Sequence, residues 1–240
     1  MIRNVFRLFR RSVTSHGFAG TVALMVKASL DPRIWSSSWR VDGGCDFDRK
    51  FGTETGGSVV QTEGLDATSP NWIHSTRYRP TPATIFHELI AALPIRHEEF
   101  TFIDFGSGKG KILLLASELP FKAIVGIEFS KDLHEVAQRN VAHYESRTQA
   151  CTHIDCLLLD ATLYDVPLGP KVCYFFNPFH EPIMAQVVRR LEASLIAAPS
   201  PTFILYYRPA LQHIFRDSKC FREFRVKQEY AIYQSTLGEV

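Results

Sequence analysis

Four polar side chains stand at or next to the ends of short apolar runs in the sequence: Asp104, Glu128, Asp160 and Asn177. A carboxylate accepts hydrogen bonds through both oxygens, so Glu128 could accept from both hydroxyls of a ribose. Asp160 could accept from an adenine amino group, and Asp104 could pair with an ammonium group. Each residue alone is equally well explained as a loop residue or a helix cap. Four of them at consecutive strand ends indicate a ligand site at one edge of a sheet.

A glycine-rich turn lies in the segment 102–110, FIDFGSGKG, and the apolar run 112–116 follows it. This order predicts a buried strand, a tight turn and a helix. Gly106, Gly108 and Gly110 have no Cβ and would let the backbone approach a ligand closely. The N-terminus of the new helix would add unpaired N–H groups and a positive dipole end. With an acid closing the next strand-like run, the pattern is typical of a nucleoside-binding βαβ unit.

The glycine spacing excludes two common phosphate-binding turns. A dinucleotide fingerprint, G-x-G-x-x-G, would place its third glycine where the chain has Lys111. A P-loop, G-x-x-x-x-G-K-[ST], would begin with glycine where the chain has Phe105, and Ile112 replaces its Mg²⁺-binding hydroxyl. The remaining pattern is D-x-G-x-G-x-G, with Glu128 at the end of the following strand.

This pattern resembles motif I of the class I S-adenosylmethionine-dependent methyltransferases, over roughly residues 78–207. The resemblance implies S-adenosylmethionine as the cofactor and no metal. The cofactor-binding residues it implies lie in the turn, at the strand ends and just before the first core helix: Thr81, Asp104, Gly106, Ser107, Gly108, Gly110, Glu128, Asp160 and Ala161.

The segment Asn177-Pro178-Phe179 resembles motif IV, (D/N)-P-P-(F/Y), of amino-directed methyltransferases. The resemblance implies a catalytic role for all three, in which Asn177 accepts from the target nitrogen and the aromatic ring walls in the substrate. Phe179 stands where the family has its second proline, and a proline-terminated strand with a buried Phe is the alternative. His180 and Glu181 could act as a base or hold a cationic substrate, or could simply begin the next helix.

Two further resemblances concern the region before the turn. Tyr78-x-Pro80-Thr81, together with the turn, is similar to seven-strand protein lysine methyltransferases. In the amino-directed methyltransferases the region before the first core helix often closes over the methionine end of the cofactor, which would give Tyr78 and Thr81 that role. Thr81 is equally well explained as a helix N-cap followed by Pro82. The segment 47–52, FDRKFG, resembles an uncharacterised bacterial group of class I methyltransferases.

Apolar runs and helical periodicity alternate through the rest of the chain. Strands are expected over residues 100–105, 122–128, 153–159, 171–176, 202–207, 221–229 and 231–236. A first core helix is expected after Thr81-Pro82, with an apolar stripe from Ile85 to Leu93, and further helices over 109–119, 131–144, after Pro182 and near 210–217. This alternation predicts an α/β fold with a Rossmann-like, doubly wound and mostly parallel seven-stranded sheet. Helices should cover both faces, and the last two strands should form an antiparallel hairpin.

Two regions are expected, an N-terminal helical arm and aromatic-rich cap over residues 1–77 and a methyltransferase domain over residues 78–240. Residues 1–30 hold five basic and no acidic side chains, whereas the rest holds 22 basic and 25 acidic ones. The main body is therefore not a polyanion binder, and no strong nucleic-acid signal is present. The basic arm is expected to pack on the domain. Peripheral membrane contact and an organellar targeting segment are the alternatives.

The five cysteines include no C-x-x-C pair and are odd in number, which favours a reducing, cytoplasmic setting. The sequence contains no uninterrupted run of roughly 18 apolar residues, so no transmembrane helix is expected. The oligomeric state is not predicted by any pattern.

The expected function is methyl transfer from S-adenosylmethionine to an amine, on a protein lysine or a small molecule. An NAD(P)-dependent oxidoreductase is one alternative, disfavoured by the glycine spacing and by the lack of a clear Tyr-x-x-x-Lys set. A non-catalytic module that binds S-adenosylmethionine is another. A degenerate domain of that kind would have no physical need for both the glycine turn and the N-P-F segment.

Overall fold

The computed structural model describes residues 45–57 and 78–238, and both stretches belong to one compact unit of the chain. The helical arm predicted over residues 1–30 and most of the aromatic-rich region lie outside the described residues. The boundary predicted at residue 77 therefore stays a prediction.

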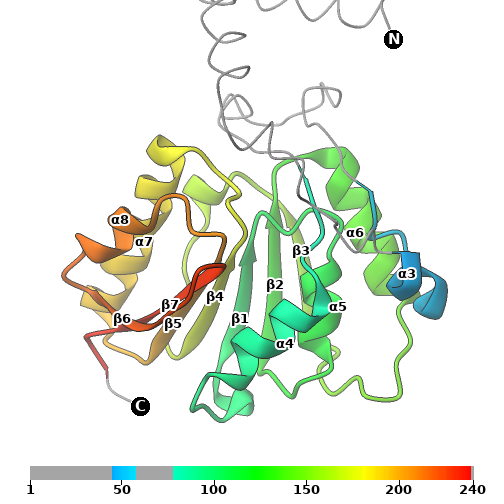
Figure 1. The fold of residues 1–240 in the computed structure, drawn as a ribbon, viewed down its shortest axis with the longest axis horizontal. Helices are drawn as coiled ribbons and strands as arrows, with labels where there is room; N and C mark the ends of the chain where they lie inside the picture. Colours follow the sequence, from blue (N-terminus) through cyan, green and yellow to red (C-terminus); the bar gives the residue numbers. More distant parts are fainter. Residues whose placement is uncertain (1–44, 58–77, 239–240) are drawn as a thin grey trace, which may run out of the picture. The chain divides into compact units, whose positions relative to one another are not determined.

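The core is one sheet of seven strands in the order β3-β2-β1-β4-β5-β7-β6 (Figure 1). The strands are β1 Thr101–Phe105, β2 Ala123–Glu128, β3 Ile154–Leu158, β4 Lys171–Phe175, β5 Thr202–Tyr207, β6 Phe221–Val226 and β7 Tyr230–Ser235. The pairs among β1 to β5 are parallel, and β7 runs antiparallel to both β5 and β6. The predicted α/β class, the mostly parallel seven-stranded sheet and the terminal antiparallel hairpin are confirmed.

The described helices are α3 Cys45–Phe51, α4 Ala83–Ala91, α5 Lys111–Ser117, α6 Lys131–His143, α7 Glu181–Ala197 and α8 Gln212–Arg216, with 3₁₀ turns η2 His97–Glu99 and η3 Ala161–Leu163. Helix α5 starts two residues later than predicted because Gly110, at φ 82°, is its left-handed N-cap. Strand β6 ends before residue 229 because Lys227 N donates to Tyr230 O and closes a turn. Within the described ranges, every helix is too short or too polar to serve as a transmembrane span.

Helices cover both faces of the sheet (Figure 1), and one apolar cluster lies between the sheet and the helices on each face. Alternate residues of a strand point to opposite faces, so Ile103 and Phe105 join the cluster of α7, whereas Phe102 joins the cluster of α4 and α5. The strand order reverses between β1 and β4, where connections leave to opposite sides. In such sheets a ligand binds beyond the carboxyl ends of the strands at this switch point.

The predicted N-cap of the first core helix is wrong. Pro82 is the N-cap of α4, which has no side-chain capping bond. The Thr81 hydroxyl lies 2.6 Å from the hydroxyl of Tyr174 on β4 instead, and Thr81 is 3% exposed. A long-range partner has therefore replaced the local cap.

Truncating Phe175 should destabilise the fold strongly. Phe175 is fully buried and stacks on Phe105, with ring centroids 4.9 Å apart and an interplanar angle of 1°. We expect Phe175→Ala to lower the free energy of unfolding by about 3–5 kcal/mol in urea denaturation, because the ring leaves a cavity. The matched control is Phe224→Ala, at a ring that is 37% exposed on the edge strand. Equal losses in the two variants would contradict this assignment of the core.

Candidate cofactor and methyl-transfer site

The sheet brings the sequence-predicted residues to one edge. The glycine turn follows β1, and Asn177 follows the adjacent strand β4. Glu128 ends β2 on the other side of β1, and Asp160 follows β3 beyond it. An added Cβ at Gly106 would lie 2.5 Å from Pro178 Cβ, so the two predicted motifs touch across the switch point.

Each glycine of the turn is required by the protein itself. Gly106, Gly108 and Gly110 have φ values of 83°, 54° and 82°, in the left-handed region that glycine tolerates best. A Cβ added at Gly108 would lie 2.3 Å from the Tyr78 ring, and one added at Gly110 would lie 3.2 Å from the Ala137 Cβ. Close approach of a ligand stays a prediction, and of the three only Gly106 is exposed.

The turn uses its own amide groups internally. Four of them donate to protein oxygens at 2.9–3.0 Å: Gly106 N and Ser107 N to Ile127 O, Gly108 N to Glu128 Oε2, and Gly110 N to Ser107 O. A phosphate-binding turn needs such N–H groups to face the ligand. The geometry therefore agrees with the glycine spacing in disfavouring a phosphate.

The Glu128 carboxylate is the centre of the site. It is 3% exposed and accepts from Gly108 N at 2.9 Å through one oxygen and from Ser130 N at 2.8 Å through the other. Burial raises the pKa of Glu128 to about 7, although these backbone bonds oppose the shift. Each carboxylate oxygen has a second lone pair, so the side chain can still accept from a ligand hydroxyl.

Asp104 lies beside it, on the strand that precedes the turn. Its side chain is 3% exposed, and burial, followed by the charge of Glu128, raises its pKa well above the ordinary value. Within residues 45–57 and 78–238, no hydrogen bond reaches the Asp104 carboxyl. A buried carboxyl without a partner is costly, and this one sits at the edge where a ligand is expected. Ser107, 6% exposed, is part of the same turn.

Asp160 has a local partner at the end of β3. Its Oδ1 accepts from Thr162 N at 2.8 Å and from Thr162 Oγ1 at 2.7 Å, which caps the 3₁₀ turn η3. Ala161 is 5% exposed in that turn. The roles predicted for Asp160 and Ala161 against an adenine ring stay predictions.

The N-P-F segment is held by the next strand. Asn177 adopts a left-handed φ of 41°, and its Oδ1 accepts from the Tyr206 hydroxyl at 2.7 Å and from Ala210 N at 3.2 Å. Phe179 is 8% exposed and belongs to the cluster under α7. The amide oxygen predicted to face the target nitrogen thus has two protein donors, and the catalytic roles of the segment stay predictions.

His180 and Glu181 begin the next helix. His180 is the N-cap of α7, and Glu181 is its first residue, 3.3 Å from His213 Nε2. A helix start was one of the two alternatives for these residues. Nowhere in the described part of the chain do three His, Cys, Asp or Glu side chains gather closely enough to ligate a metal ion.

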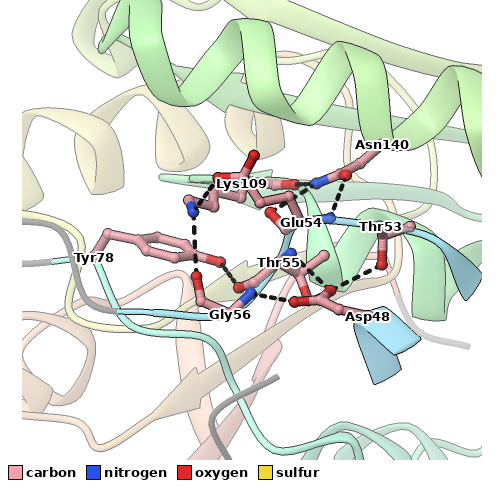
Figure 2. A network of polar contacts seen from close by, with 8 residues as sticks. All are labelled: Asp48, Thr53, Glu54, Thr55, Gly56, Tyr78, Lys109 and Asn140. Atoms are coloured by element: carbon pink, nitrogen blue, oxygen red, sulfur yellow. Dashed lines mark hydrogen bonds and ion pairs between the residues drawn. The ribbon is translucent and has the colours of Figure 1, made fainter. Parts of the chain in front are cut away.

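A polar network over the glycine turn was missed by the sequence analysis (Figure 2). The segment after α3, residues 53–56, folds around the Asp48 carboxylate, which accepts bonds of 2.7–2.9 Å from Thr53, Thr55 and Gly56. This segment, called the clamp below, contacts Lys109 of the turn. Two features of the sequence pointed to this network. The segment 47–52 carries a family resemblance that gave no residue a role, and Asn140 is a polar residue on the buried face of α6.

Neither the family models nor the curated proteins include a match to this sequence. Among solved structures, an RNA methyltransferase from Salinibacter ruber, in complex with S-adenosyl-L-homocysteine, is 18% identical at a TM-score of 0.45, covering 67% of this chain and 95% of that one. An rRNA methylase from Streptococcus thermophilus is 12% identical, with a TM-score of 0.45 and coverages of 67% and 98%. A SAM-dependent methyltransferase from Leishmania major is 14% identical, with a TM-score of 0.44 and coverages of 64% and 70%. At such identities the likeness is one of backbone fold alone.

A side chain at Gly108 should clash with Tyr78, and the clash should disappear when Tyr78 is truncated. Gly108→Ala is expected to cost about 1–3 kcal/mol of overpacking against the Tyr78 ring and about 1–2 kcal/mol for its left-handed backbone. In the Tyr78→Ala background only the backbone cost should remain. The measurement is a double-mutant cycle on free energies of unfolding. Additive effects would show that the ring does not pack on this glycine.

Proposed function

We propose that this chain is an S-adenosylmethionine-dependent methyltransferase that acts on an amine, in a protein lysine or a small molecule. The observation that supports it most is the pair of buried carboxyls, Asp104 and Glu128, beside a turn whose amides are already bonded. In their ionised forms, two carboxylates repel a diphosphate and attract a cation. S-adenosylmethionine carries a sulfonium and an ammonium group, together with ribose hydroxyls that donate hydrogen bonds.

The residues present fit this cofactor. Asp104 offers an ammonium group an acceptor that has no hydrogen-bond partner among the described residues, and Glu128 offers its remaining lone pairs to the ribose hydroxyls. The turn between them approaches the ligand with the exposed Gly106. An NAD(P)-dependent oxidoreductase is supported less well, because the turn has few amides left for a pyrophosphate.

The bound S-adenosylmethionine supplies the methyl group from its positively charged sulfur. Transfer needs no protein nucleophile, so this chain contributes orientation and exclusion of water. Pro178 lies against Gly106 and follows Asn177 directly, so the proposal places the acceptor nitrogen on this side of the turn. Tyr206 and Ala210 fix the Asn177 side chain, which keeps this turn in one conformation.

Binding of the cofactor distinguishes the proposal from its rivals. We expect S-adenosylmethionine and S-adenosylhomocysteine to raise the melting temperature in a thermal-shift titration, and NAD(P) to leave it unchanged, because only a ligand of the native state stabilises it. A shift with NAD(P) alone would contradict the methyltransferase assignment. Binding without methyl transfer to any of a panel of lysine peptides and small primary amines would favour a non-catalytic module.

Two substitutions should separate binding from turnover. Glu128→Ala removes the acceptor of Gly108 N and of the ribose, and we expect cofactor binding to be lost. Asn177→Ala should leave the dissociation constant within about twofold while methyl transfer disappears, because only the acceptor side is affected. The matched control is Gln186→Ala, at an exposed amide on α7. Full activity of Asn177→Ala would show that the motif IV assignment is wrong.

Cofactor affinity should fall as the pH is lowered through 7. The pKa of Glu128 is raised to about 7 by burial, so below that pH the ligand-free protein holds a proton on this carboxyl. The cation and the ribose hydroxyls favour the ionised form, so the proton must leave on binding. The dissociation constant of S-adenosylmethionine should then rise about tenfold for each pH unit below about 7. Calorimetry at several pH values measures this, and a flat profile throughout would contradict it.

A further inference from the structure

We infer that Asn140, Lys109 and Asp48 are positioning residues for the cofactor: they hold the clamp, residues 53–56, on the glycine turn and thereby fix the backbone at Gly108 and Lys109. This inference rests on the proposed function, because it assigns these residues to the binding of S-adenosylmethionine. None of the three belongs to the residues that the motif resemblance implies.

Asn140 joins the clamp to the turn across a large separation in sequence. Its Oδ1 accepts from Glu54 N at 2.8 Å, and its Nδ2 donates to Glu54 O at 3.1 Å and to Lys109 O at 2.8 Å (Figure 2). The side chain thus pairs with Glu54 as a neighbouring strand would. Asn140 is 3% exposed on α6, and a buried amide without these partners would be costly. Its three bonds explain how an amide is accommodated on the buried face of α6.

Lys109 gives the clamp a second attachment. Its Nζ lies 2.8 Å from Glu54 Oε1 and 3.2 Å from Gly56 O, and the Lys109 side chain is 10% exposed. The Glu54 side chain is 66% exposed, so solvent weakens this ion pair. The bond to the Gly56 carbonyl and the burial of the lysine stem therefore matter more than the charge pair.

Tyr78 connects the clamp to the buried carboxyls. Its hydroxyl donates to Thr55 O at 2.7 Å, while its ring lies against Gly108. Burial, followed by the negative charges of Asp48, Asp104 and Glu128, raises the pKa of Tyr78, so its hydroxyl stays a donor. The ring thus packs on Gly108 while the hydroxyl holds the clamp.

Asp48 gives the clamp its shape from within. Its carboxylate accepts from two backbone amides and two hydroxyls, at Thr53, Thr55 and Gly56. Burial tends to raise the pKa of Asp48, but these bonds prevail and lower it, so the carboxylate stays charged. The clamp is thus built by its own Asp and docked by Asn140 and Lys109.

The backbone at Gly108 and Lys109 connects the clamp to the proposed cofactor site. Gly108 N is bonded by Glu128, and Lys109 O is bonded by Asn140. The same stretch of backbone therefore joins the proposed ribose-binding carboxylate to the clamp. Loss of the clamp contacts frees this backbone and releases Glu128 from one of its backbone donors, which costs cofactor affinity without touching the cofactor directly.

The test compares two amides on the same helix. Asn140→Ala is expected to weaken the binding of S-adenosylhomocysteine at least tenfold in calorimetry, at a temperature where the variant is folded by circular dichroism. It should also speed hydrogen exchange of the amides at residues 53–56 and 106–110 in the ligand-free protein. The matched control, Gln138→Ala, changes an exposed side chain two residues earlier and should bind like the wild type. A merely structural role would lower the melting temperature but leave the dissociation constant of the folded variant unchanged.

The outcomes separate this inference from the proposed function. Binding by Asn140→Ala within twofold of the wild type, with faster exchange at residues 53–56, would overturn the inference and leave the proposed function standing. A wild-type protein that binds neither S-adenosylmethionine nor S-adenosylhomocysteine would overturn both. If Asn140→Ala fails to fold, Lys109→Met provides the same test, because it keeps the buried stem and removes only the bonds to Glu54 and Gly56. We expect at least a threefold loss of affinity there, and an unchanged affinity would overturn the inference.

Discussion

The bond between Gly108 N and the Glu128 carboxylate is the interaction on which the rest of the site depends. It joins the turn after β1 to the end of β2 and fixes the peptide at the point where the strand order reverses. Gly108 adopts a left-handed φ of 54°, and the space that a Cβ would need is filled by Tyr78. Gly108 thus bonds to the end of β2 and also packs against Tyr78, whose hydroxyl holds the clamp.

This arrangement has an energetic cost that the fold alone does not explain. Glu128 has a pKa of about 7 in the folded protein and an ordinary value of 4.5, so the unfolded chain releases this proton at lower pH than the folded one. The stability that the protonated carboxyl provides is present below 4.5 and is lost as the pH rises towards about 7. Asp104 adds a second buried carboxyl close by. Sites that keep such groups at the expense of stability are commonly functional.

The strands, helices and strand-end residues could be predicted because they follow from local patterns. Periodicity placed β5 at its observed bounds, and the register of parallel strands carries Asp104, Glu128 and Asn177 to one edge. The clamp could not be predicted in this way, because Glu54 and Asn140 are 86 residues apart and their pairing depends on the folded sheet. The cap assigned to Thr81 failed for the same reason, since its partner is Tyr174 on β4.

The N-P-F segment shows how one altered residue is accommodated. Proline at position 179 would lack the ring that Phe179 contributes to the cluster under α7, so this position serves the core. Asn177 and Pro178 are only partly buried, and the first is tied to Tyr206 while the second touches Gly106. Three separate contacts therefore hold this turn: Phe179 packs in the core, Tyr206 bonds to Asn177, and Pro178 contacts Gly106. Under the proposed function, these contacts would hold the turn in place before the methyl acceptor binds, which is what methyl transfer without a protein nucleophile requires.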